Sequence, residues 1–175
     1  MDDEAYGSEE TVTHEGPESR QPTVEDLLEL CRELNSRGAK YLIVGGFAIR
    51  GAGYIRETGD LDVIIDTEPE NEARVLKSLE ILPDKAVLHL QPGEVEKYTV
   101  VRLADEIIID LMKSASGIDY AEASKDIVIR EVEGVPIPFA SPRLLWRMKR
   151  KTYREKDLAD LIFLRQQYPE VTNES

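Results

Sequence analysis

The stretch from Tyr41 to Asp66 constrains the fold more than any other part of the sequence. A short apolar run, YLIV, stops at the glycine pair Gly45 and Gly46, and three residues suited to a short helix follow. After a second glycine-rich break, another apolar run extends from Leu61 to Ile65. Apolar runs of this length between glycines are typical of buried strands. The stretch therefore predicts a strand, a tight turn, a short helix and a second strand.

Two aspartates accompany the second of these strands. Asp60 lies at its start and Asp62 lies inside it. Residues two apart on a strand share a face, so the two carboxylates should lie close together. Neighbouring carboxylates repel each other unless a positive charge lies between them. Because Mg²⁺ commonly binds one or two carboxylates together with substrate phosphates, the pair predicts a magnesium site.

A third acid, Asp110, lies late in the apolar segment from Glu106 to Met112, which we expect to form another buried strand. A carboxylate in such a place is costly to bury without a partner. Two interpretations remain open. Asp110 could cap the turn after the strand, or it could join Asp60 and Asp62 as a third metal ligand or a general base.

Composition limits the class of protein. The chain has 175 residues, of which 41% are hydrophobic, and its formal net charge is −13. Such a chain can bury one sizeable core, and its acidity argues against general binding to nucleic acid. We find neither a secretory signal nor an apolar run of about 20 residues, so we expect a cytoplasmic protein without a membrane span. The single cysteine, Cys31, lies in a helical pattern and should be buried.

The chain divides into three parts. Residues 1–22 carry seven acids against one arginine and few large apolar residues, which predicts a disordered acidic tail. Residues 23–140 should form an α/β (α+β) core, with a mixed sheet flanked by helices. Residues 141–170 should form a helical C-terminal segment packed on that core.

Local signals place further helices. Thr23 and Asp26 resemble a helix N-terminus, and apolar residues recur at helical spacing from Val24 to Leu34. Residues 70–82 repeat such a pattern. Ser141 is a good N-cap with proline at the next position. The last helix should begin near Glu155, with an apolar side formed by Leu158, Leu161, Ile162 and Leu164.

Other signals place strands. We expect strands over residues 98–103 and in the short run around His89. Residues 127–139 should form a hairpin with its turn at Glu133 and Gly134. Pro136 and Pro138 suit an edge strand, because proline lacks the amide that a central strand uses.

A cluster of cations lies between the two C-terminal helices. In an acidic protein such a cluster could clamp phosphates, although it could also be a solvated face. Its members are Arg147, Lys149, Arg150, Lys151, Arg154 and Lys156.

Together these residues resemble the nucleotidyltransferase superfamily related to DNA polymerase β. The resemblance runs from about Ala39 to Arg165. It rests on the glycine pair, the spaced acids and a C-terminal lysine–aspartate pattern; the residues concerned are Gly45, Gly46, Arg56, Thr58, Asp60, Asp62, Asp110, Lys149, Lys156 and Asp157. Small minimal and abortive-infection-type members are the most similar. The second glycine is a departure, because serine is often found there.

The resemblance implies a transferase that moves a nucleoside monophosphate from an NTP to a hydroxyl, with release of pyrophosphate. Backbone amides at Gly45 and Gly46 would hold the triphosphate, and Arg56 and Thr58 would shape the loop before Asp60. Asp60, Asp62 and Asp110 would hold Mg²⁺, as two ions, or Mn²⁺. Lys149, Lys156 and Asp157 would complete the nucleotide site, with Asp157 alternatively orienting a lysine.

The acceptor is left open. The NTP could be ATP, CTP or another, and the acceptor could be a tRNA end, a partner protein or a small molecule such as an antibiotic. The main alternative is a nucleotide-binding module that acts as a toxin or antitoxin partner through protein contacts. A P-loop NTPase and a dinucleotide-binding domain are disfavoured, because neither GxxxxGK[ST] nor GxGxxG occurs.

Overall fold

The computed structural model describes residues 11–14 and 18–173. Its strands are β1 (Thr11–His14), β2 (Tyr41–Val44), β3 (Asp60–Ile65), β4 (Val100–Ala104), β5 (Ile108–Met112), β6 (Ser114–Ala115), β7 (Ile118–Asp119), β8 (Ile127–Val132) and β9 (Val135–Ala140). Seven of them form one sheet in the order β1-β4-β5-β3-β2-β9-β8, and β6 pairs with β7. In the large sheet β3 runs parallel to β5 and antiparallel to β2. The predicted mixed sheet is therefore confirmed.

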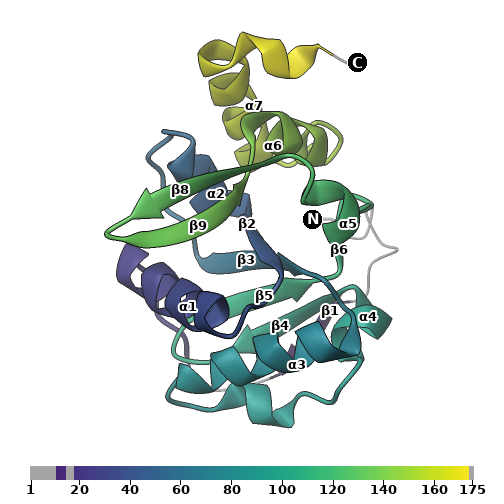
Figure 1. The fold of residues 1–175 in the computed structure, drawn as a ribbon. Coiled ribbons are helices and arrows are strands. Elements are labelled where there is room, and N and C mark those ends of the chain that lie inside the picture. The colour runs from purple at the N-terminus through teal and green to yellow at the C-terminus, as the bar shows by residue number, and fades with distance from the viewer. Residues whose placement is uncertain (1–10, 15–17, 174–175) are drawn as a thin grey trace.

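Helices pack on this sheet and extend beyond it (Figure 1). They are α1 (Val24–Ser36), α2 (Gly45–Gly51), α3 (Pro69–Ser78), α4 (Glu94–Tyr98), α5 (Tyr120–Ala123), α6 (Pro142–Lys149) and α7 (Glu155–Gln167), with 3₁₀ turns at Leu79–Ile81, Ala86–His89 and Pro169–Thr172. Helices α1 and α3 contact each other on the same side of the sheet, and α6 and α7 pack together at one end of the molecule. The predicted helical C-terminal portion is present.

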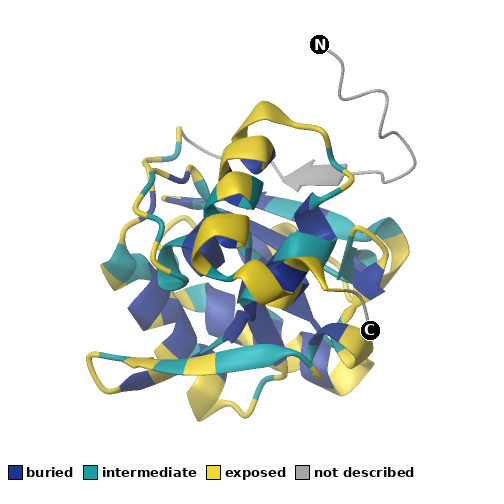
Figure 2. Ribbon diagram, turned by 90° about the horizontal axis from the view of Figure 1, so that it is seen from above, coloured by how far each residue is buried: buried dark blue, intermediate teal, exposed yellow. Residues whose placement is uncertain are grey.

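The two faces of the central strands differ in burial. One face is packed in the core and carries only apolar side chains: Leu61, Val63, Val101, Leu103, Ile109 and Leu111. On the other face, Asp60, Asp62 and Arg102 are half-buried. Figure 2 shows the buried residues gathered in the interior and exposed residues along the outer turns of helices. The half-buried face thus leaves polar groups of β3 and β4 within reach of solvent.

Several local signals are confirmed. The Thr23 hydroxyl accepts a bond from the Asp26 amide, and the Asp26 carboxylate accepts one from the Thr23 amide, which is a complete capping box. Ser141 caps α6 in a similar way through the Leu144 amide. The turn between β8 and β9 has φ of 48° at Glu133 and 81° at Gly134, so both residues are left-handed, as a tight hairpin turn requires.

Two strand predictions are wrong. The run around His89 is a 3₁₀ turn rather than a strand. β9 is not an edge strand, because β8 lies outside it and β2 inside it. Its prolines are accommodated because β9 and β2 are paired only at Ile43 and Phe139. The Pro136 carbonyl accepts a bond from the Asn35 side chain instead of from a strand.

The N-terminal segment differs from the predicted disordered tail where it is described. Residues 1–10 and 15–17 lie outside the described residues, but Thr11–His14 forms a strand parallel to β4. Ser19 donates to the Asp105 carbonyl at 2.6 Å, and Arg20 pairs with Asp26 at 2.7 Å. The packed structure therefore begins before Thr23.

The expected apolar side of α7 is wrong in part. Leu164 is buried, but Leu158 and Ile162 are 50% and 51% exposed. The buried positions of this helix include two acids, Asp157 and Asp160. Cations from neighbouring segments pair with these two carboxylates, which explains why the carboxylates can be buried.

Two further expectations concern the whole chain. Cys31 is buried in α1, and burial raises the pKa of its thiol to about 12. Among the described residues, none of the helices combines the length and the apolarity that crossing a membrane needs.

Candidate active site

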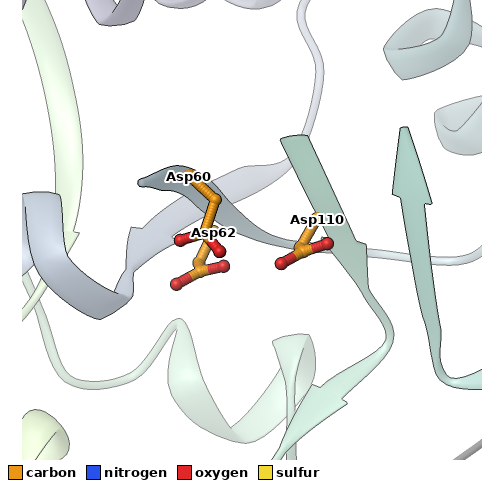
Figure 3. Close-up of side chains that lie close together, drawn as sticks. All are labelled: Asp60, Asp62 and Asp110. Atoms are coloured by element: carbon orange, nitrogen blue, oxygen red, sulfur yellow. The ribbon is translucent and has the colours of Figure 1, made fainter. Parts of the chain in front are cut away.

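Three carboxylates meet on the half-buried face of the sheet (Figure 3). Asp60 and Asp62 come from β3 and Asp110 from β5, where Asp62 and Asp110 are directly paired in register. One ligand oxygen from each lies within 4.8 Å of the others. Asp110 thus joins the other two acids, as the second interpretation of the sequence expects, and it does not cap a turn.

Burial and mutual repulsion make this cluster costly in charged form. Burial raises the pKa of Asp62 well above its usual value, and the charges of Asp60 and Asp110 raise it further. The pKa of Asp60 is also raised, first by burial and then by Asp110, while Arg102 and Lys156 oppose the shift. The oxygen ligands match those that Mg²⁺ and Mn²⁺ prefer, and a divalent cation would relieve the repulsion. The donor set therefore fits the predicted metal.

Arg102 is a site residue that the sequence analysis missed. It lies on β4 opposite Asp110. Its Nε and one terminal nitrogen each donate to an Asp110 oxygen at 2.9 Å, and that terminal nitrogen also donates to Asp60 at 3.1 Å. The hydrogen bonds to Asp110 are the main reason that the pKa of Arg102 is raised. An arginine in the middle of an apolar strand was the available signal, but only the strand register reveals its partner.

The glycine pair lies directly against the acids. Gly45 has φ of +67°, and a Cβ placed there would lie 2.0 Å from an Asp62 carboxylate oxygen. No side chain larger than hydrogen fits at that distance, so glycine lets the backbone approach the acid. The preceding residue, Val44, makes no capping bond through its side chain, so the first amides of α2 keep their donors.

The second glycine makes room for Thr58. A Cβ at Gly46 would lie 2.5 Å from the Thr58 hydroxyl oxygen and 2.6 Å from its Cβ. Thr58 is buried, and its hydroxyl donates to the Asp60 carbonyl at 3.1 Å. Thr58 therefore supports the start of β3 and occupies space that a serine at position 46 would need.

Lys149 and Asp157 lie in a buried ion network. The Lys149 ammonium lies 2.9 Å from Asp157 and 3.1 Å from Asp160. Arg56 donates two bonds of 2.8 Å to Asp160. The network thereby links α6, α7 and the loop before Asp60. These contacts hold Lys149, Asp157 and Arg56 together in the fold, with Asp157 against the Lys149 ammonium. Their part in a nucleotide site stays a prediction.

Lys156 is the predicted cation that stays exposed beside the acids. Its charge opposes the rise in the pKa of both Asp60 and Asp62. Arg147 and Arg154 of the same basic cluster pair with Glu122 and Asp157 instead. Three members of the cluster, Arg147, Lys149 and Arg154, are thus paired with carboxylates. The charge of Lys156 acts on the acids of the site.

Comparison with solved structures identifies the fold. LnuA, a lincosamide antibiotic adenylyltransferase bound to lincomycin, matches with a TM-score of 0.61 at 15% identity, over 85% of this chain and 99% of that chain. ANT(2'')-Ia in complex with adenylyl-2''-tobramycin matches with a TM-score of 0.53 at 14% identity, over 85% and 91% of the chains. An antigenic nucleotidyltransferase-like protein from Paracoccidioides brasiliensis gives 0.50 at 19% identity, over 81% and 74%.

The chain therefore has the nucleotidyltransferase fold that its motifs resemble. The sequence itself matches neither a family profile nor a curated protein. Likeness at these identities establishes the fold alone.

Proposed function

We propose that this protein is a metal-dependent nucleotidyltransferase that moves a nucleoside monophosphate from an NTP to a hydroxyl group. The observation that carries the proposal is the cluster of three carboxylates, Asp60, Asp62 and Asp110, within 4.8 Å beside a glycine pair. A structural role alone gives no reason to gather three acids on a half-buried face, because their repulsion costs stability.

Different groups of the chain bind the phosphates and the metal ions. The free amides at Gly45 and Gly46 bind phosphate oxygens of the NTP, and Lys156 adds a positive charge next to them. Asp60, Asp62 and Asp110 would hold Mg²⁺ or Mn²⁺. When bound, such ions stabilise negative charge on the attacking and leaving oxygens.

The reaction exchanges one bond at phosphorus for another. The acceptor oxygen forms a bond to the α-phosphorus, and the bond from that phosphorus to the bridging oxygen breaks, so pyrophosphate leaves. The acceptor's proton passes to a carboxylate of the cluster. We assign that task to Asp110, which lies on the strand beside Asp62.

For the acceptor we propose a small molecule that carries a hydroxyl group. Two of the similar structures contain small molecules: an adenylyltransferase bound to lincomycin, and ANT(2'')-Ia in complex with adenylyl-2''-tobramycin. The net charge of −13 favours such acceptors over a polyanion such as tRNA.

Label transfer tests the proposal. The protein is incubated with Mg²⁺ and each α-labelled NTP, together with a lincosamide, an aminoglycoside, bulk tRNA or no acceptor. The test variant carries Asp60→Asn and Asp62→Asn. The matched control is Glu131→Gln, which removes one exposed carboxylate on the edge strand β8.

We expect label on a small-molecule acceptor with the wild type and with Glu131→Gln, and loss of at least 100-fold in the double variant. Transfer that survives in the double variant would refute the assignment of the site. If the protein neither binds an NTP nor transfers label, the interpretation as a module that acts through protein contacts replaces this one. Label on tRNA alone would keep the reaction and overturn the acceptor class.

A further inference from the structure

Arg102 brings a positive charge into contact with two of the three acids of the cluster. Its guanidinium group covers both oxygens of Asp110 at 2.9 Å and reaches Asp60 at 3.1 Å. A planar guanidinium matches a carboxylate through two parallel bonds, so this contact fixes the Asp110 side chain. The remaining acid, Asp62, forms no ion pair with Arg102 and faces Gly45.

We propose that Arg102 is a positioning residue that serves as a built-in counter-ion for Asp110, so that the protein without nucleotide binds one divalent cation. This inference rests on the proposed function of the acid cluster. The first cation binds mainly to Asp60 and Asp62. Asp110 joins a metal site only when the nucleotide brings a second cation and the guanidinium yields its place.

The charge count leads to the same conclusion. Three carboxylates and one guanidinium sum to −2, which one divalent cation neutralises. With Arg102 the cluster is thus neutral once one divalent cation is bound. Without Arg102 the sum is −3, so a net charge of −1 remains after one divalent cation binds, and this charge attracts a second. Lys156 does not change this comparison, because it is exposed and can turn toward solvent or toward the triphosphate.

The test counts bound Mn²⁺ in the absence of nucleotide. Free Mn²⁺ is followed by its electron paramagnetic resonance signal during titration of the wild type and of Arg102→Met, Arg102→Lys and Arg102→Met/Asp110→Asn. Arg74→Met serves as the control, since it removes an exposed arginine from α3. Circular dichroism spectra confirm that each variant is folded.

We expect one Mn²⁺ per chain for the wild type, two for Arg102→Met, and one again for Arg102→Met/Asp110→Asn. Arg102→Lys keeps the charge and should bind one, which a merely structural role of the arginine would not predict. Two Mn²⁺ on the wild type, or one on a folded Arg102→Met protein, overturns the inference while leaving the label-transfer result intact. If Arg102→Met does not fold, the counts for the wild type and Arg102→Lys still decide. Absence of Mn²⁺ binding to the wild type overturns the metal site itself.

Discussion

Asp160→Asn should destabilise the protein strongly, because Asp160 joins two cations in the buried ion network. Its side chain is fully buried, at 0% exposed, and accepts two bonds of 2.8 Å from Arg56 and one contact of 3.1 Å from Lys149. Removing one partner of a buried ion pair typically costs about 3–5 kcal/mol. Lys149 keeps Asp157, and asparagine retains one acceptor oxygen. We therefore expect the low end, about 3 kcal/mol.

Such a loss is measurable by urea unfolding followed by circular dichroism. A loss of about 3 kcal/mol is a large part of the roughly 5–15 kcal/mol that stabilises a typical domain. It would lower the melting temperature by roughly 6–12 °C for a chain of this size. Glu131→Gln, with its exposed side chain, should stay within about 0.5 kcal/mol of the wild type.

A double-mutant cycle isolates the pair. Arg56→Met combined with Asp160→Asn should cost at least about 1 kcal/mol less than the sum of the single changes, because each single change leaves the other group unpaired. Additive effects, or a loss below about 1 kcal/mol for Asp160→Asn, would contradict the view that this network ties α7 to the loop before β3.

Three further predictions concern the site and its supports. Gly45→Ala should abolish Mn²⁺ binding in the titration described above, because a Cβ there would lie 2.0 Å from an Asp62 oxygen. Gly46→Ala should reduce label transfer at least tenfold, and Thr58→Gly in the same chain should restore part of it, since Thr58 occupies the space that the new methyl group needs. Burial would raise the pKa of Asp157, but Lys149 and hydrogen bonds lower it to about 2, against an ordinary value of 3.8. Because this folded-state pKa is depressed, its contribution of roughly 2 kcal/mol is present above pH 4 and lost as the pH falls toward 2, so Asp157→Asn should flatten the fall in urea stability over that range.

The local part of the site could be predicted from the sequence. Gly45, Asp60 and Asp62 lie within one stretch in which alternation along a strand and the conformational freedom of glycine determine the geometry. To predict that Asp110 joins this site, one must also assume that its strand pairs with β3. The pairing of Asp62 with Asp110 agrees with that assumption. The glycine at position 46 looked like the loss of a hydroxyl, whereas the structure places Thr58 in that space.

The wrong prediction for α7 concerns charged side chains that could lie either inside the protein or at its surface. In the C-terminal helices, lysines and aspartates alternate with leucines, so the pattern does not reveal which polar side is buried. Asp157 and Asp160 are buried because Lys149 of α6, Arg154 at the start of α7 and Arg56 of the loop before β3 pair with them. Leu158 is left exposed. One of these pairs, Arg56 with Asp160, joins residues 104 positions apart, which a local sequence pattern does not reveal.

Ion pairs that only the fold reveals also change the chemistry expected of the site. A sequence with three acids and several nearby cations suggests a cluster of free acids facing a cluster of free lysines and arginines. In the fold, Lys149 is paired with carboxylates and does not face the acid cluster as a free cation. Arg102 of β4 lies among the acids instead. The positive charge that the acids meet first is therefore an internal one, fixed by the pairing of β4 with β5. On the proposed function, a metal ion must compete with this charge for the acids. The pairing of β4 with β5 would then determine how many cations the protein binds without nucleotide.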